Sequence, residues 1–152
     1  MDKINYPLAR QYEITSKFGP RTHPITGEIH FHNGIDIATP EGTEVVAPAG
    51  GVVVDVGEDS RNGIYLKANL IGGLIVSFAH LSEAILSRGD HFKPGDVLAL
   101  TGNTGATTGP HLHYRVRDSY GNDIDPLSVT VGDNHQGAII AAAAALGVLL
   151  WQ

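Results

Sequence analysis

Short apolar runs, separated by glycine and proline, recur along the first 131 residues of the chain. Runs of this length predict strands when they are rich in β-branched residues and bounded by turn residues. The predicted strands cover residues 45–47, 52–54, 64–68, 74–79, 97–100 and 112–116. Gly72 and Gly73 separate two of these runs and predict a hairpin. Only residues 83–87 allow a helical turn, so we expect a mainly β fold with antiparallel sheets.

The last residues of the chain have a different pattern. Residues 134–152 contain no Asp, Glu, Lys or Arg, and residues 138–151 are apolar. A helix over 138–151 would be apolar on every side, and at about 21 Å it would be shorter than the roughly 30 Å hydrocarbon core of a bilayer. We therefore expect a β-rich domain over 1–131, a linker over 132–137 and a hydrophobic C-terminal helix over 138–151. This helix would anchor in a membrane or dock on a partner protein.

Composition excludes several classes of function. The chain of 152 residues carries 16 acidic and 10 basic side chains, so it lacks the basic surface typical of nucleic-acid-binding proteins. Cysteine is absent, which excludes a thiol nucleophile, a disulfide framework and a thiolate metal site. A metal site would therefore combine Asp or Glu with some of the eight histidines. The first residues contain no apolar signal segment, so we expect either delivery by a route other than general secretion or a leader that this sequence does not include.

Two short motifs supply potential metal ligands. His111 and His113 are two residues apart on a predicted strand, so their side chains face the same side. His32 and Asp36 would lie about 13 Å apart in an extended chain, so the segment must bend, which Gly34 permits. Each motif alone is compatible with a structural role, as a half-exposed strand or a solvated turn. Together, His32, Asp36 and His113 are typical of a catalytic zinc site with three protein ligands and an open fourth position.

The remaining histidines are weaker candidates. His30 lies two residues before His32 and is an alternative ligand. His23, His91 and His135 are expected to have structural or solvated positions. The motifs HExxH and GxSxG, which indicate other hydrolase classes, are absent.

A series of ordered motifs resembles the lysostaphin/LytM-type zinc endopeptidases, which cut peptidoglycan cross-links. The motifs extend over about residues 14–127 and read SKFGPRTHP, HNGID, PEGTEVVAP, AHLS, GNTG, TGPHLH and DPL. The resemblance implies antiparallel sheets that form a groove over one Zn²⁺ ion. It assigns His32, Asp36 and His113 to the zinc, and catalytic roles to His80 and His111.

The resemblance also implies a substrate, the peptide cross-links of bacterial peptidoglycan, and a place of action at the cell wall or in the periplasm. The first motif is similar to that of members that cut the D-alanyl–diaminopimelate bond. We expect Arg21 in this motif to contact carboxylates of the substrate, with a structural ion pair as the alternative role. The apolar segment 138–151 and the missing signal segment together predict a wall-opening enzyme that is carried in a phage virion and anchored in a membrane.

The alternative function is a non-enzymatic, zinc-containing module that binds the wall or has a structural role. Phe78 and the atypical apolar segment at 138–151 support this alternative. The family usually has Tyr at position 78, so a hydroxyl is missing close to the expected site. All three expected metal ligands are present in the chain, which favours the enzyme.

Overall fold

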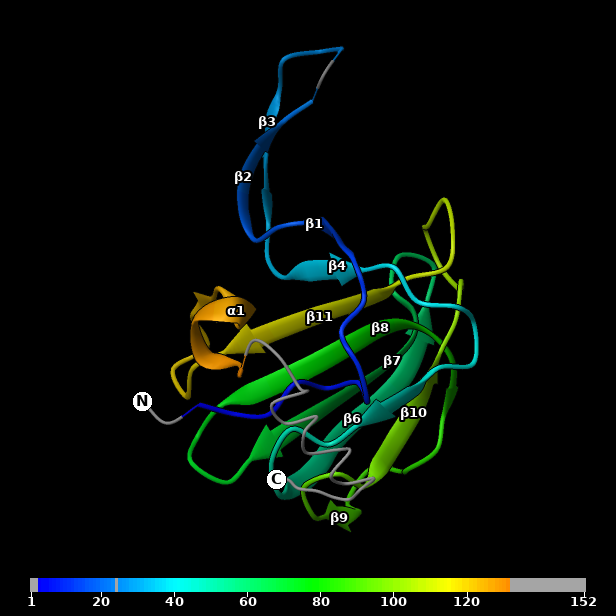
Figure 1. Ribbon diagram of the computed structural model, residues 1–152, viewed down its shortest axis with the longest axis vertical. Helices are drawn as coiled ribbons and strands as arrows, with labels where there is room; N and C mark the ends of the chain where they lie inside the picture. Colours follow the sequence, from blue (N-terminus) through cyan, green and yellow to red (C-terminus); the bar gives the residue numbers. More distant parts are fainter. Residues whose placement is uncertain (1–2, 24, 132–152) are drawn as a thin grey trace.

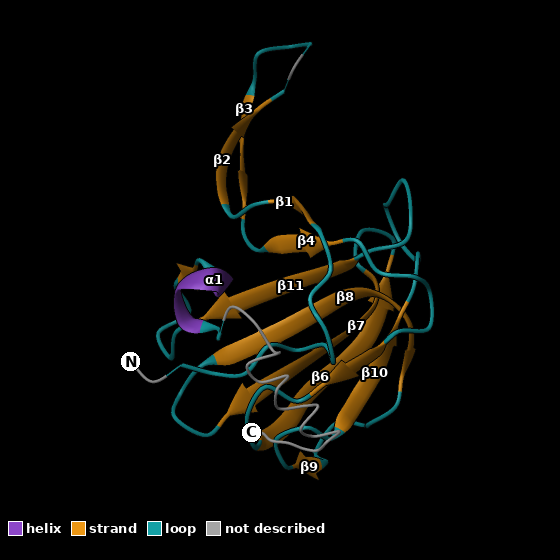
Figure 2. Ribbon diagram, viewed as in Figure 1, coloured by secondary structure: helices purple, strands orange, loops and turns teal. Residues whose placement is uncertain are grey.

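Strands dominate the described part of the chain, which comprises residues 3–23 and 25–131 of the computed structural model (Figures 1 and 2). The expected linker over 132–137 and helix over 138–151 lie outside the described residues. Among the described residues, no helix has the length and apolar character needed to cross a membrane. One helical turn, α1 (Pro126–Val129), follows the last strand.

Ten strands form one sheet, and two more form a separate hairpin. The sheet contains β1 (Ile14–Ser16), β4 (Ile35–Ile37), β5 (Glu44–Val46), β6 (Gly51–Asp59), β7 (Gly63–Leu70), β8 (Ile75–Ala84), β9 (His91–Phe92), β10 (Val97–Thr101), β11 (Leu112–Arg117) and β12 (Asp123–Ile124). The hairpin consists of β2 (Gly19–Thr22) and β3 (Ile29–His32), and it projects beyond the sheet at the top of Figure 1.

The pairing between the strands is antiparallel throughout, as expected for this fold class. The main path through the sheet is β1-β4-β11-β8-β7-β6-β9, with β10 paired to β5 and β8, and β12 paired to β11. All six predicted strands are present, and β7 and β8 form the hairpin predicted at Gly72 and Gly73. The expectation of a helical turn at 83–87 was wrong. Strand β8 continues to Ala84, because Glu83 and Ala84 pair with Leu100 and Ala99 of β10.

The core lies on one face of the sheet, and the alternation along β11 shows why. Leu112, Tyr114 and Val116 are completely buried, whereas His113 and Arg115 between them are half-buried on the opposite face. Side chains of successive residues in a strand point to opposite faces. One strand therefore contributes both to the core and to the polar surface on which the site is built.

The N-terminal segment covers part of this core. Its apolar side chains Ile4, Tyr6 and Leu8 are buried. The backbone N–H of Ile4 donates to the carbonyl of Val129 at the end of α1 over 2.8 Å. The buried side chains and this bond connect the N-terminal segment to the core and to α1.

Candidate metal centre and active site

The bend between β3 and β4 brings His32 and Asp36 together. His32 ends β3, and Gly34 precedes the first residue of β4. The backbone at Gly34 passes so close to β11 that an added Cβ would lie 2.4 Å from the carbonyl oxygen of Tyr114. Glycine is therefore required here for close packing between strands as well as for the bend. As a result, Nε2 of His32 lies 3.4 Å from Oδ1 of Asp36, although both residues come from one short segment.

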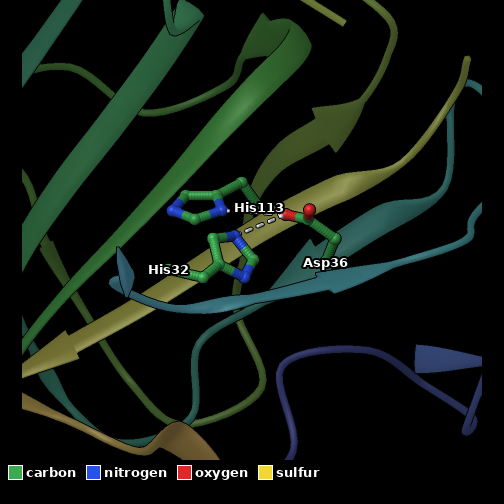
Figure 3. A group of neighbouring side chains, drawn as sticks. All are labelled: His32, Asp36 and His113. Atoms are coloured by element: carbon green, nitrogen blue, oxygen red, sulfur yellow. Dashed lines mark hydrogen bonds and ion pairs between the residues drawn. The ribbon is translucent and has the colours of Figure 1, made fainter. Parts of the chain in front are cut away.

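Strand β11 supplies the third potential ligand. His113 is directly opposite Asp36 in the register between β11 and β4. Its Nδ1 lies 2.9 Å from Oδ1 of Asp36. Figure 3 shows His32, Asp36 and His113 turned toward one another. One ligand atom from each of the three residues lies within 4.8 Å of the others.

The outer hydrogen bonds of the two imidazoles determine which nitrogen faces Asp36. Nδ1 of His32 donates to the backbone oxygen of Lys17 over 3.1 Å. Nε2 of His113 donates to the side-chain oxygen of Asn33 over 2.9 Å. With these protons placed outward, Nε2 of His32 and Nδ1 of His113 are the nitrogens that would present lone pairs to a bound metal ion.

The chemistry of this donor set fits a Zn²⁺ ion. Partial burial raises the pKa of Asp36, but hydrogen bonds and charge interactions with His113 and His32 outweigh it, so the pKa lies well below its usual range. The carboxylate is therefore ionised, and Nε2 of His32 and Nδ1 of His113 converge beside it. Two neutral imidazoles and one carboxylate form a ligand combination that zinc uses in catalytic sites.

His80 is held beside these ligands in an unusual backbone conformation. Its φ of 62° is the only positive value of a non-glycine residue among the described residues. Two hydrogen bonds hold it: its N–H donates to the carbonyl of Asn62 over 2.7 Å, and its Nδ1 donates to the carbonyl of Thr104 over 2.8 Å. Left-handed backbone at a non-glycine residue is costly and is frequent at functional sites.

The second expected catalytic residue, His111, is oriented in a similar way. Its Nδ1 lies 2.9 Å from the carbonyl oxygen of Gly109 and 3.0 Å from Oγ1 of Thr107. Its Nε2 lies 3.8 Å from Oδ1 of Asp36, and its ring centre is 4.7 Å from that of His80.

Burial is the main cause that lowers the pKa of His80. Its imidazole is thus neutral near pH 7, with a lone pair on Nε2 available to accept a proton.

The two histidines and the ligand group line one open cavity of about 650 Å³. The lining residues are Arg21, His30, Phe31, His32, Asn33, Asp36, Arg61, Asn62, His80, Ala106, Thr107, Thr108, His111, His113 and Arg115. The structure thus brings together the five histidine and aspartate residues expected from the sequence. The sequence analysis missed Asn33, Arg61 and Arg115. Of these, Arg115 had a detectable signal, because it follows His113 by two residues on the same face of a predicted strand.

Arg21 lies on the hairpin and also lines this cavity. Its guanidinium donates to Oγ of Ser16, which in turn lies 3.2 Å from Nδ1 of His32. The side chain therefore reaches the environment of a ligand through one hydroxyl group. Its expected contact with substrate carboxylates stays a prediction.

His23, His30 and His91 are not among the three grouped ligands, and His135 lies outside the described residues. His30 has an exposed side chain that lies 3.3 Å from Glu28, and it is not one of the three grouped ligands. His23 has a structural position, because its Nδ1 accepts hydrogen bonds from the N–H groups of Ile25 and Thr26. The alternative ligand role of His30 thus has no support from the geometry.

Phe78 faces the core, which corrects the expectation that it lies close to the site. It is completely buried, and its ring stacks on Tyr114 with centroids 5.5 Å apart and planes 10° apart. Its neighbour Ala79, rather than Phe78, pairs with His113. In this chain a hydroxyl at position 78 would point into the core, so its absence removes nothing from the cavity.

Known proteins are similar to this chain in sequence and in fold. The model of peptidase family M23 matches residues 30–126. An uncharacterized metalloprotease of Haemophilus influenzae is 39% identical over 134 residues, which cover 87% of this chain and 28% of the relative. The peptidoglycan DD-endopeptidase ShyA of Vibrio cholerae is 38% identical over 112 residues, 73% of this chain and 26% of the relative.

A solved peptidase structure is also similar to this chain. The crystal structure of a zinc containing peptidase from Vibrio cholerae superposes with a TM-score of 0.76 at 36% identity, over 82% of this chain and 39% of that one. The curated relatives are much longer than this chain, which spans between a quarter and a third of their length.

Proposed function

Since the chain belongs to peptidase family M23, we propose that it is a zinc-dependent endopeptidase that hydrolyses peptide cross-links of bacterial peptidoglycan. The observation that carries this proposal is the arrangement of two histidines beside a three-ligand group. His80 and His111 line the same cavity as His32, Asp36 and His113. A wall-binding module has no need of two oriented imidazoles at this place. Phe78, which had supported that alternative, lies in the core.

The zinc ion, His80 and His111 would have separate roles in the reaction. A bound Zn²⁺ supplies Lewis acidity, which polarises the scissile carbonyl and lowers the pKa of an attacking water. We assign the role of proton acceptor to His80, because burial lowers its pKa and its Nδ1 proton is already donated to Thr104, which leaves Nε2 to accept. We assign to His111 the hydrogen bond to the developing oxyanion or the proton transfer to the leaving amine, because its Nε2 faces Asp36 and the ligand group. For either role Nε2 would carry a second ring proton, since the Nδ1 proton is donated to Gly109.

Digestion of purified cross-linked peptidoglycan tests the activity. The metal-loaded chain should release muropeptides, a chelator should abolish this release, and added Zn²⁺ should restore it. If the chain holds zinc and releases no muropeptide, the enzyme is excluded and the non-enzymatic module is favoured.

Substitution of His113 on β11 and of His111, which directly precedes β11, tests their separate roles. His113→Ala should remove both metal and activity, because it deletes a ligand. His111→Ala should retain most of the metal and lose turnover. Metal content by atomic absorption, measured with the activity, separates the two. Complete loss of metal in His111→Ala would show that the division between ligand and catalytic residue is wrong.

For the scissile bond, we propose the D-alanyl–diaminopimelate cross-link. The name of the relative ShyA, a peptidoglycan DD-endopeptidase, supports this choice, as does the motif that contains Arg21. Mass spectrometry of the digestion products should find new D-alanine carboxyl termini. New glycine termini from polyglycine bridges would contradict the proposal.

For delivery, we propose that the apolar segment 138–151 associates with a membrane or a partner protein, as in a phage virion. The apolar composition of the segment supports this proposal. The chain should be expressed with and without residues 134–152 and fractionated. The full chain should require detergent or lipid, and the shortened chain should not. A full chain that stays monomeric without detergent would exclude a membrane anchor.

A further inference from the structure

We propose that Arg61 and Arg115 form a binding site for a carboxylate of the substrate peptide, so that the enzyme selects anionic cross-links over neutral ones. This inference rests on the proposed function and adds the chemical feature of the cross-link that is recognised. Three arginines, Arg21, Arg61 and Arg115, line the cavity, and Asp36 is the one acidic residue among the lining residues of the described chain. Because Asp36 belongs to the ligand group, the remaining wall of the cavity is cationic.

Arg115 presents a guanidinium group in a fixed orientation. It follows His113 by two residues on the same face of β11. Its Nε lies 2.7 Å from Oδ1 of Asp123, and its Nη2 lies 3.3 Å from Oδ2 of the same carboxylate. These bonds use two of the five N–H donors of a guanidinium and hold its plane. The other donors stay available to a planar anion in the cavity, and carboxylates pair with guanidinium in this way.

Backbone hydrogen bonds hold the main chain of Arg61 in place close to that of His80. Its backbone carbonyl accepts a hydrogen bond from Ala106 over 3.0 Å, and the carbonyl of the next residue, Asn62, accepts one from His80 over 2.7 Å. An added Cβ at Gly105 would lie only 2.8 Å from the carbonyl oxygen of Arg61. The turn and the loop are therefore closely packed, and the base of the arginine cannot move far from the catalytic histidine.

The guanidinium of Arg61 is available to a ligand. The residue is exposed, and the ion pairs of the described residues do not include it. Arg21, in contrast, donates to Ser16. Arg61 thus makes no ion pair within the described chain, although, after the hydrogen bonds from Asn62, its charge also helps to lower the pKa of the exposed neighbour Asp59, whereas Arg115 is held by Asp123. A flexible and a fixed cation at the same cavity suit an anionic group carried by the substrate.

The proposed substrate carries such a group close to the bond that breaks. In a D-alanyl–diaminopimelate cross-link, the carbon that bears the scissile amide nitrogen also bears a free carboxylate. A peptide bound with its scissile bond at His80 and His111 therefore brings this carboxylate into the same cavity. Amidation of the carboxylate removes its charge and leaves the peptide bond unchanged, which provides a direct test.

The experiment compares two purified muropeptide dimers, one with free and one with amidated diaminopimelate, as substrates of the zinc-loaded chain. We expect the wild-type enzyme to prefer the free form in kcat/KM. Arg61→Gln should raise KM for the free form about tenfold, as expected for loss of a charge-assisted hydrogen bond, and should change KM for the amidated form less than threefold. Arg88→Gln is the matched control, since Arg88 is exposed and outside the cavity lining.

Arg115 has to be tested with a double variant, because substitution of Arg115 alone leaves Asp123 without its ion-pair partner. The double substitution Arg115→Gln/Asp123→Asn replaces the ion pair by neutral groups, and its thermal unfolding shows whether the fold is kept. The folded double variant should lose the same preference for the free form. If the wild-type enzyme cleaves both dimers equally well and Arg61→Gln leaves KM unchanged, the carboxylate site is excluded while the endopeptidase activity stands.

A different result is expected if the chain is not an endopeptidase. If the zinc-loaded chain cleaves neither dimer, the proposed activity is contradicted, and calorimetric binding of the two dimers then tests the carboxylate site. Tighter binding of the free form, lost in Arg61→Gln, would support the site. Equal binding of both forms would overturn it.

Discussion

At the scale of the residue, the site depends on the hydrogen bonds behind its histidines. Five histidines line the cavity, and four of them, His32, His80, His111 and His113, each have one ring nitrogen hydrogen-bonded to a group behind the ring. The partners are the backbone carbonyls of Lys17, Thr104 and Gly109 and the side chain of Asn33. Substitution cannot delete a backbone carbonyl, but it can delete the amide of Asn33. Such outer partners orient a metal ligand and fix its tautomer.

Asn33→Leu should therefore weaken zinc binding by about 10- to 100-fold, because Nε2 of His113 loses its acceptor. Asn33→Asp keeps an acceptor at the same place and should retain the affinity. Competition with a chromophoric chelator measures both dissociation constants. Asn103→Leu, at an exposed loop position outside the cavity lining, serves as the control. Unchanged affinity in Asn33→Leu would show that Asn33 does not position His113.

The lowered pKa of His80 predicts the acid limb of the pH–rate profile. Burial is the main cause of the shift, so the pKa of His80 lies below the ordinary histidine value of about 6.5 and the fold favours the neutral imidazole. As a proton acceptor, His80 should stay active down through pH 6.5, and kcat/KM should fall only at lower pH, as the imidazole becomes protonated. Metal content has to be measured at each pH, so that loss of metal is not mistaken for protonation. An acid limb centred above pH 6.5 would contradict the assignment.

The same shift has a consequence for stability. The pKa of His80 is lower in the folded state than in the unfolded state, so its contribution to stability is complete above about pH 6.5. The contribution is lost as the pH falls through the folded-state pKa, because the unfolded chain then binds the proton more readily. In His80→Gln, the free energy of unfolding should therefore decline less on acidification than in the wild type. Denaturant unfolding at several pH values measures this difference, and identical slopes would contradict it.

At the scale of the element, the turn between β6 and β7 and the loop after β10 form one support for His80. Asn62 in the turn accepts from its backbone N–H, and Thr104 in the loop accepts from its ring. Oγ1 of Thr104 also accepts from the N–H of Ile64 over 3.0 Å and donates to the carbonyl of Leu81 over 2.6 Å. The left-handed backbone of His80 is therefore held by two segments that are themselves bound to each other.

Gly63→Ala should disrupt this support. Its added Cβ would lie 2.2 Å from Oγ1 and 2.4 Å from the carbonyl carbon of Thr104, at a φ of +64°. We expect a loss of about 2–4 kcal/mol in the free energy of unfolding, from left-handed strain and overpacking together. We also expect at least a tenfold loss of kcat with zinc retained, because the loop that orients His80 has to move.

Gly121→Ala is the matched control for this substitution. Gly121 also has a positive φ, +88°, but no atom lies within 4 Å of its added Cβ. It should cost about 1–2 kcal/mol from strain alone and leave kcat unchanged. Equal values of kcat in the Gly63→Ala variant and the wild type would show that the close packing does not position His80.

At the scale of the whole molecule, the potential metal ligands connect separate parts of the fold. His32 ends the hairpin strand β3, Asp36 lies on β4, and His113 lies on β11 within the sheet. The hairpin projects from the sheet in Figures 1 and 2, and it carries Phe31 and Arg21 on the cavity wall. An ion bound by these residues links the base of the hairpin to the sheet.

Zinc should therefore stabilise the folded chain. At a free zinc concentration 100 times the dissociation constant, binding to the folded state alone adds about 2.7 kcal/mol to the free energy of unfolding. Thermal unfolding with zinc and with excess chelator should show a higher Tm with zinc. His113→Ala should show the same Tm in both conditions, because it lacks a ligand. A wild-type Tm that does not respond to zinc would argue against a metal bound by all three residues.

The sequence by itself determined the features that depend on local periodicity and on residue type. Strands alternate their side chains with a period of two, so the spacing of His111 and His113 was enough to place both on one face. The glycine between His32 and Asp36 allowed the bend, and the absence of cysteine limited the ligands to imidazole and carboxylate. Short β-branched runs between turn residues were likewise enough to predict the six strands.

The tertiary structure alone decided the features that depend on which distant segments meet. Asp36 and His113 are 77 residues apart in the chain, and their contact follows from the register between β4 and β11. Phe78 faces the core, and Asn33 and Arg61 face the cavity, because of the strands and loops packed around them. No local pattern carries this information, because pairing partners and register are settled by the joint burial of all strands.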